Sequence, residues 1–290
     1  MADSVEMQDI RGLDVDKTVK GFALTEYAFK SACTISSTSA DHIRWYQETS
    51  ADLTAVSPSV ISNISPLSSF PTLEPTWTRN TSYVKKYAAE SFISMEDMKS
   101  ADIDVVARTL LRLTRAVVKQ VDSDIWDVIT ESRSPSTNGI NSVATNAAWD
   151  ADTGQDPIED IMDMKLQIAN YGYNPEGATL WLSPKDNKSL LTWLITTKGS
   201  SIPSFASDKV KSGVVMSILG VNVRVNLNVT ADYGALVIDK VSTTWKSFTN
   251  TTSVAIEEKG IGTKFRVWEL GIAILTDPKA VCLLTNTQTA

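Results

Sequence analysis

The most constraining stretch of the sequence is an amphipathic run without glycine or proline, from Ala101 to Thr130. Its apolar residues recur at steps of three or four, the spacing of one face of an α-helix: Ile103, Val106, Leu110, Leu113, Val117, Val121, Ile125 and Val128. Such a helix is about 45 Å long at ~1.5 Å per residue, more than twice the mean length for globular proteins. The sequence therefore predicts one long helix, capped by Ser94 or Ser100, on which the rest of the chain is organised.

The opposite face of this helix carries a basic stripe with the same spacing, formed by Arg108, Arg112, Arg115 and Lys119. A stripe of this kind is most often solvated or paired with acidic side chains. Its alternative role is to face a partner, either nucleic acid or the carboxylates of a neighbouring protein. Both interpretations stay open at this point.

A second unusual stretch separates two strand-like segments, 41–49 and about 74–93. It has no lysine or arginine between Gln47 and Thr78, and no glycine occurs between Phe22 and Asn138. It is too apolar for a flexible linker and too long for an ordinary loop. We interpret it as an ordered two-stranded arm whose apolar side chains are buried by another copy of the chain; the candidate interface residues are Trp45, Leu53, Val56, Val60, Ile64, Leu67, Phe70 and Trp77. The alternative is a disordered serine-rich loop.

The remaining sequence alternates helices and strands and then ends in strands alone, which predicts an α+β fold. A partial helical stripe at 14–32 is followed, after the long helix, by a helix near 157–172 with Ile158, Ile161, Met164, Leu166 and Ile168 on one face. A short strand at 178–183, a helix at 184–199 and a half-buried strand through Val221, Val223, Val225 and Leu227 come next. The last third contains a strand at 233–239, a hairpin around the glycines at 260 and 262, and a strand at 280–285.

Composition excludes several classes of function. The net charge of −7 argues against a protein whose main function is to bind nucleic acid. Cys33 and Cys282 form no metal pattern and fit a reducing compartment. The chain has neither a signal peptide nor a run of about 20 apolar residues, so no membrane association is expected.

We find no candidate catalytic, cofactor-binding or metal-ligating residue. The single histidine, His42, is interpreted as structural. The acidic residues 150–156 miss the spacing of a calcium loop, and the glycines at 260 and 262 sit between strands, where a phosphate loop is not expected. No nucleophile elbow is present.

Several short motifs, taken in order, resemble the tailed-phage major capsid proteins of the Hong Kong 97 fold. They are Trp77 followed by 93–98 (ISMEDM) at the entry to the long helix, 218–223 (ILGVNV), 234–239 (GALVID), 265–271 (FRVWELG) and 277–280 (DPKA). Each motif alone has little specificity, and the resemblance depends on their common order and spacing. It covers about residues 41–285.

The resemblance implies an N-terminal arm (1–40), an extended E-loop (41–80), a P-domain with the spine helix (81–134 and 241–290) and an A-domain (135–240). It implies a structural protein, not an enzyme, that forms hexamers and pentamers of an icosahedral shell around double-stranded DNA, held without sequence specificity. Scaffolding, portal and decoration proteins are the further partners that it implies. The expected location is the virion capsid, assembled in the host cytoplasm.

The sequence departs from some members of that family in two respects. It has no room for a long N-terminal scaffolding domain, so we expect a separate scaffolding protein or none. It has no lysine between Lys30 and Lys85, so the arm offers no amine for a covalent link to a neighbour. The competing interpretations are an encapsulin, which resembles the same fold but encloses cargo enzymes, and a soluble α/β enzyme whose site is not recognisable.

Overall fold

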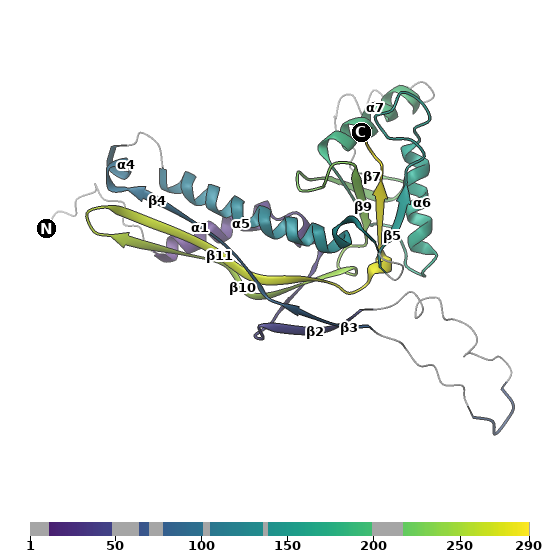
Figure 1. Cartoon of the computed structure of the whole chain (residues 1–290), viewed down its shortest axis with the longest axis horizontal. Coiled ribbons are helices and arrows are strands. Elements are labelled where there is room, and N and C mark those ends of the chain that lie inside the picture. Colours follow the sequence, from purple (N-terminus) through teal and green to yellow (C-terminus); the bar gives the residue numbers. More distant parts are fainter. Residues whose placement is uncertain are drawn as a thin grey trace.

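The structure is a computed structural model, and it describes residues 12–47, 64–69, 78–100, 105–135, 139–198 and 217–289. These residues form an elongated unit of helices packed on a long sheet, and a second unit around a six-stranded sheet at one end of it (Figure 1). Helices and strands are both present and share cores, as the α+β prediction requires.

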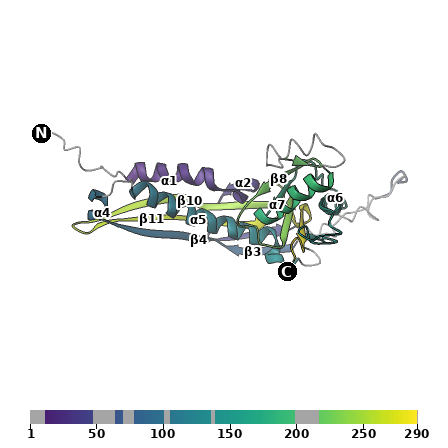
Figure 2. The same cartoon turned by 90° about the horizontal axis from the view of Figure 1, so that it is seen from above.

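The elongated unit is a four-stranded sheet with helices on one face. Its strand order is β1 (Thr34–Ser37), β10 (Thr243–Glu258), β11 (Gly262–Leu275) and β4 (Lys85–Ser94), with only the β1–β10 pair parallel. Helices α1 (Gly12–Glu26) and α5 (Val105–Ile129) run along this sheet (Figure 2). Val19 of α1, Val117 of α5 and Val267 of β11 belong to one apolar cluster, so both helices bury their apolar faces against the same side of the sheet.

The long helix is confirmed from Val105 to Ile129, a length of about 37 Å at ~1.5 Å per residue. Residues 101–104 lie outside the described residues. The expected cap at Ser94 belongs to a different helix: Ser94 Oγ accepts the Asp97 N–H at 3.1 Å and caps the short α4 (Met95–Ser100). Ser94 is the last residue of β4 and directly precedes α4, and the sequence pattern alone did not separate α4 from α5.

The second unit has strand order β5 (Asn141–Ala144), β12 (Val281–Thr285), β9 (Tyr233–Val237), β6 (Thr179–Leu182), β8 (Val221–Val225) and β7 (Ser217–Ile218). Helices α6 (Pro157–Ala169) and α7 (Pro184–Trp193) cover one face of this sheet through Ile161, Met164 and Leu190. On the other face, Trp181 and Leu283 join the cluster that contains Ile125 and Trp126 of α5. The two units therefore share one continuous core.

Three residues of the expected apolar faces are exposed instead. Leu166 is 56% exposed, because the buried face of α6 is Ile161, Met164 and Ile168, and Leu166 lies about 200° around the helix from Met164. Val225 and Leu227 are 45% and 84% exposed, since β8 ends at Val225 and the chain leaves the sheet there.

Strand β12 pairs with β9 and β5 in the second sheet, so part of the range 241–290 lies apart from the long hairpin of β10 and β11.

The arm begins as a two-stranded antiparallel ribbon of β2 (His42–Gln47) and β3 (Thr78–Tyr83), which projects from the middle of the molecule (Figure 1). Residues 64–69 of the arm are described and form a turn. The candidate interface residues Leu53, Val56, Val60, Phe70 and Trp77 lie outside the described residues. Short elements complete the fold: α2 (Phe29–Ala32), η1 (Glu131–Arg133), η2 (Leu194–Lys198) and η3 (Pro278–Ala280).

Candidate assembly surfaces

Side-chain hydrogen bonds join the two strands at the base of the arm. Trp45, at the centre of β2, is half-buried and donates its indole N–H to Ser82 Oγ at 3.0 Å, across the ribbon. Asn80, opposite Trp45, donates to Gln47 Oε1 at 3.2 Å. Tyr46 and Tyr83 are exposed on this ribbon. The ribbon thus presents aromatic side chains outward, while its own hydrogen bonds hold it in register.

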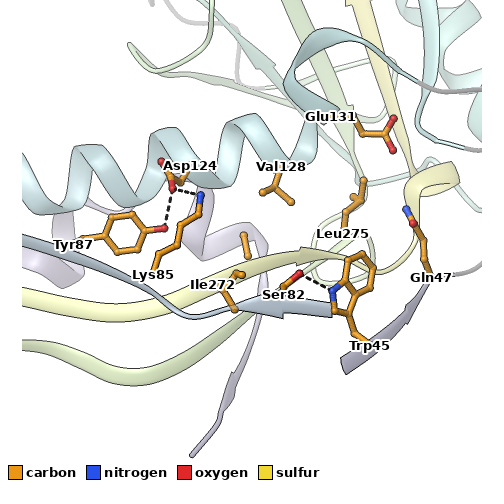
Figure 3. A pocket seen from close by; sticks show the side chains of 11 residues that line it. Trp45, Gln47, Ser82, Lys85, Tyr87, Asp124, Val128, Glu131, Ile272 and Leu275 are labelled. Atoms are coloured by element: carbon orange, nitrogen blue, oxygen red, sulfur yellow. Dashed lines mark hydrogen bonds and ion pairs between the residues drawn. The ribbon is translucent and has the colours of Figure 1, made fainter. Parts of the chain in front are cut away.

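A hollow of about 310 Å³ opens between the arm base, the C-terminal part of α5 and the end of β11 (Figure 3). Trp45, Val128, Ile272, Ala273 and Leu275 supply apolar lining. On one side, Asp124 accepts from Lys85 Nζ at 2.8 Å and from the Tyr87 hydroxyl at 2.9 Å. These contacts lower the pKa of Asp124, although desolvation by burial acts in the opposite direction. The charges of Lys85 and Asp124 are therefore paired with each other on this side of the hollow.

The described turn of the arm exposes a leucine. Ser68 N–H donates to the Ser65 carbonyl at 3.1 Å, which closes a β-turn with Pro66 and Leu67 at its two central positions. Leu67 has φ of +70° and is 107% exposed. Proline at the first central position and a positive φ at the second are the marks of a type II turn, where glycine or asparagine is favoured. Ile64, at the start of this turn, is half-buried.

The basic stripe lies on the exposed side of α5. Arg108, Arg112, Arg115 and Lys119 are all exposed, as the helical spacing predicts. Val105, Arg108, Thr109, Leu111 and Arg112 line a shallow hollow of about 400 Å³. Lys17 and Lys20 on α1 are exposed too, and Lys20 pairs with Asp16 at 2.6 Å. The N-terminal half of α5 therefore presents a basic stripe, although the whole chain is acidic and α1 and α5 together carry as many acidic as basic residues.

A buried polar network attaches the N-terminal segment to the long helix and the hairpin. Glu269 on β11, fully buried, accepts from Lys30 Nζ, the Tyr27 hydroxyl and, at 3.0 Å, the Thr251 hydroxyl. Burial beside this carboxylate raises the pKa of Tyr27 far above its ordinary value. A buried ion pair of this kind is costly to break, because either partner alone is an uncompensated charge.

Asp122 of α5 completes this attachment. Its carboxylate accepts the backbone N–H groups of Ala28 at 2.8 Å and Lys30 at 3.2 Å, and so caps α2 from another helix. Burial raises the pKa of Asp122 to about 6, against the opposing effect of these hydrogen bonds. The sequence did not single out this network, because residues 27–30, 122 and 269 converge only through the tertiary fold.

The chain turns from α5 into the second unit through a strained backbone. Glu131, Ser132 and Arg133 have φ of 45°, 53° and 67° in succession. The left-handed region costs a non-glycine residue roughly 1–2 kcal/mol. Arg133 holds the turn by donating to Thr230 Oγ1 at 2.7 Å and pairing with Asp127 at 3.3 Å.

Among the described residues there is no cluster of metal-ligating side chains, and no described helix is both long and apolar enough to cross a membrane. Asp150 of the discounted calcium pattern pairs with Lys185 at 2.8 Å and accepts the Thr289 N–H at 2.6 Å. His42 lies exposed on β2.

Known proteins share this architecture. A family model described as phage capsid protein matches residues 79–284. The fold resembles the capsid of the cyanophage P-SCSP1u (TM-score 0.70, 13% identity, 89% of this chain and 88% of that one) and Mycobacterium phage Che8 (0.64, 14%, 91% and 92%). It also resembles a virus-like particle from Pyrococcus furiosus (0.61, 12%, 94% and 98%). No curated protein sequence matches this chain.

These neighbours share the fold at low identity, and the family match spans most of the chain. The resemblance to tailed-phage capsid proteins of the Hong Kong 97 fold and the α+β architecture are both confirmed. The chain belongs to the phage capsid protein family, and is a structural protein of the virion capsid that associates with copies of itself.

Proposed function

We propose that this chain is the major subunit of an icosahedral shell, that it assembles as hexamers and pentamers in the host cytoplasm, and that it acts without catalysis or a cofactor. The observation that carries the proposal is the arm. A ribbon anchored by Trp45 and Ser82 leads to a turn whose leucine has no contact with either core. Such a side chain is buried only when another copy covers it.

The proposed division of the chain follows from this function. It comprises an N-terminal arm (1–40), an E-loop (41–80), a P-domain (81–134 and 241–290) and an A-domain (135–240). Strand β12, at the end of the P-domain range, pairs into the sheet that the A-domain range supplies. Scaffolding, portal and decoration proteins are the proposed further partners.

The helical layer is the proposed inner surface of the shell. Arg108, Arg112 and Lys119 on α5 and Lys17 on α1 are exposed on this layer. A basic stripe attracts the phosphates of double-stranded DNA without reading its sequence, and its affinity falls with added salt.

Size measurements test the shell itself. The purified chain is expected to elute from a gel-filtration column as capsomers or shells and to show closed particles in negative-stain microscopy. A chain that stays monomeric, with or without enzymatic turnover, would overturn the proposal. Particles purified from a producing host should contain DNA; a uniform protein cargo would instead favour the encapsulin interpretation.

The basic stripe has its own test. The double variant Arg108→Gln, Arg112→Gln is expected to form empty shells in normal yield and DNA-filled particles in reduced yield. Its matched control, Lys86→Gln with Lys259→Gln, removes the same charge from exposed positions on β4 and the hairpin turn. Equal losses in both variants, or a loss of empty shells in the first, would contradict a DNA-facing role.

A further inference from the structure

We propose that the acidic N-terminal segment, residues 1–11, covers the shallow hollow at the start of α5 in the unassembled subunit, and that it occupies Arg108 and Arg112 until DNA displaces it. The segment is then an intrachain cover of the basic stripe. This inference rests on the proposed DNA-facing role of the stripe, and it adds the means by which that role is restrained before DNA is packaged.

The first argument is that these two arginines have no counter-charge among the described residues. Arg108 and Arg112 are exposed, lie one helical turn apart and line a hollow of about 400 Å³. Within the described part of the chain, neither guanidinium group has an ion pair or a hydrogen bond. Asp16 of the adjoining α1 is already engaged by Lys20 at 2.6 Å and by the Ser253 N–H at 3.0 Å.

The second argument is the composition of the N-terminal segment, which lies outside the described residues. The sequence of residues 1–11 (MADSVEMQDIR) intersperses acidic with apolar side chains: Asp3, Glu6 and Asp9, with Val5, Met7 and Ile10. The hollow presents the complementary set, because its guanidinium groups stand beside apolar lining from Val105 and Leu111. A carboxylate matches the fork of an arginine, and an apolar side chain gains by leaving water for the lining.

The third argument is the place from which the segment starts. The described chain begins at Gly12 of α1, and Val15 and Val19 of this helix share an apolar cluster with Leu110 and Leu113 of α5. The start of α1 and the start of α5 lie at the same end of the molecule in both views (Figure 1, Figure 2). Residues 1–11 reach about 36 Å when extended, at ~3.3 Å each, against about 22 Å for the whole of α1. The segment is therefore long enough to reach the hollow of its own chain.

The consequence is competition for the same guanidinium groups. Carboxylates of the segment and phosphates of DNA both bind arginine, so each excludes the other. An exposed carboxylate–guanidinium pair is weak, whereas packaged DNA presents many phosphates at once. Packaged DNA therefore displaces the cover, and dilute nucleic acid does so poorly.

Neutralising the segment tests the cover. The unassembled chain with Asp3→Asn, Glu6→Gln and Asp9→Asn is expected to bind fluorescent double-stranded DNA at low salt roughly tenfold more tightly than wild type, the combined effect of two or three exposed ion pairs. Adding Arg108→Gln and Arg112→Gln is expected to abolish this difference, because the groups for which both ligands compete are then absent. Equal affinities of wild type and the neutralised chain would overturn the cover.

Two matched controls separate the segment from other acidic residues. Asp152→Asn, Glu159→Gln and Asp163→Asn together remove the same charge from exposed positions of the second unit. Asp102→Asn with Asp104→Asn removes the carboxylates that precede α5 in the sequence and lie outside the described residues. If either control tightens DNA binding as much as the N-terminal variant does, the proposal is wrong. If no chain binds DNA, wild type included, the DNA-facing role is overturned together with it.

Cross-linking identifies the chain that supplies the segment. A chain with Val5→Cys and Thr109→Cys, oxidised at high dilution, is expected to form an intrachain disulfide in the monomer band. The control pairs Val5→Cys with Lys188→Cys, an exposed position on α7, and is expected to stay unlinked. Background from Cys33 and Cys282 is small, because both are buried and burial raises the pKa of each thiol to about 12. A disulfide found only in dimers would assign the segment to another copy and overturn the intrachain cover.

Discussion

At the scale of single residues, the turn after α5 contains backbone conformations that are unfavourable in free energy. Glu131, Ser132 and Arg133 all occupy the left-handed region, and Arg133 secures them through Asp127 and Thr230. The turn sends the chain from the end of the long helix toward β5. Strain of this kind persists only where the surrounding contacts determine the conformation.

We predict that Ser132→Gly stabilises the unassembled subunit by roughly 0.5–1 kcal/mol. Glycine adopts the φ of 53° without strain, which favours the folded state. Part of this gain is lost, because glycine also raises the conformational entropy of the unfolded chain. Urea unfolding measures this difference. The control is Ser134→Gly, two residues on, where φ is −130° and glycine is expected to destabilise by a similar amount. Destabilisation by both variants would show that the turn is not strained.

Asp122 predicts a pH dependence with a definite sign. Its pKa is about 6 in the fold against 3.8 as the ordinary value, so protons bind more tightly to the folded chain. Its contribution to stability is therefore greatest below pH 3.8 and is lost as the pH rises through 6. Between pH 4 and 7, wild type should lose about 2 kcal/mol of unfolding free energy relative to Asp122→Asn.

This comparison isolates one carboxyl group among several that titrate. Asp16 and Asp124 have lowered pKa values, so they contribute with the opposite sign, and both remain in the Asn variant. Urea midpoints of the two subunits measured across the pH range give the difference. A constant offset between the curves would show that Asp122 titrates normally.

At the scale of elements, the spacing of apolar residues predicted those helices and strands whose formation depends on the local sequence. The spacing of Leu110, Leu113, Val117 and Val121 gave α5, because a helix face buried on a sheet repeats every three or four residues. Leu166 was misplaced because its apolar type was weighed above its spacing: it lies two residues from both Met164 and Ile168, on the side of α6 away from the core. Register, strand order and the capping of α2 by Asp122 depend on contacts distant in sequence, and no local pattern carries them.

The arm was predicted as an element, and its function as an interface stays a prediction. Replacing Ser50–Leu73 by a short Gly/Ser linker is expected to leave the circular dichroism of the subunit unchanged, because β2 and β3 pair at the base without that segment. Particle yield should collapse, since the apolar side chains of the arm would be gone. Normal yield, or global unfolding, would each show that the segment serves another purpose.

At the scale of the whole molecule, stability of the shell has to come from non-covalent burial repeated over many copies. A single exposed ion pair contributes only ~0–1 kcal/mol, so charge alone is a weak source of cohesion. An apolar contact is worth more, roughly 1.5–3 kcal/mol for a fully buried leucine side chain. Summed around a closed shell, contacts of this size would make apolar burial the stronger source of cohesion.

The shell is accordingly predicted to lack covalent cross-links through the arm. An isopeptide bond to asparagine needs a neutral lysine amine, and the chain has no lysine between Lys30 and Lys85. Lys85 lies at the arm base, where its ammonium group is engaged by Asp124 at 2.8 Å. Arg44 and Arg79 cannot substitute, because a guanidinium group is not a nucleophilic amine. Particles boiled in detergent with reductant should therefore run as a single band near 31.6 kDa; a ladder of higher bands would refute this prediction.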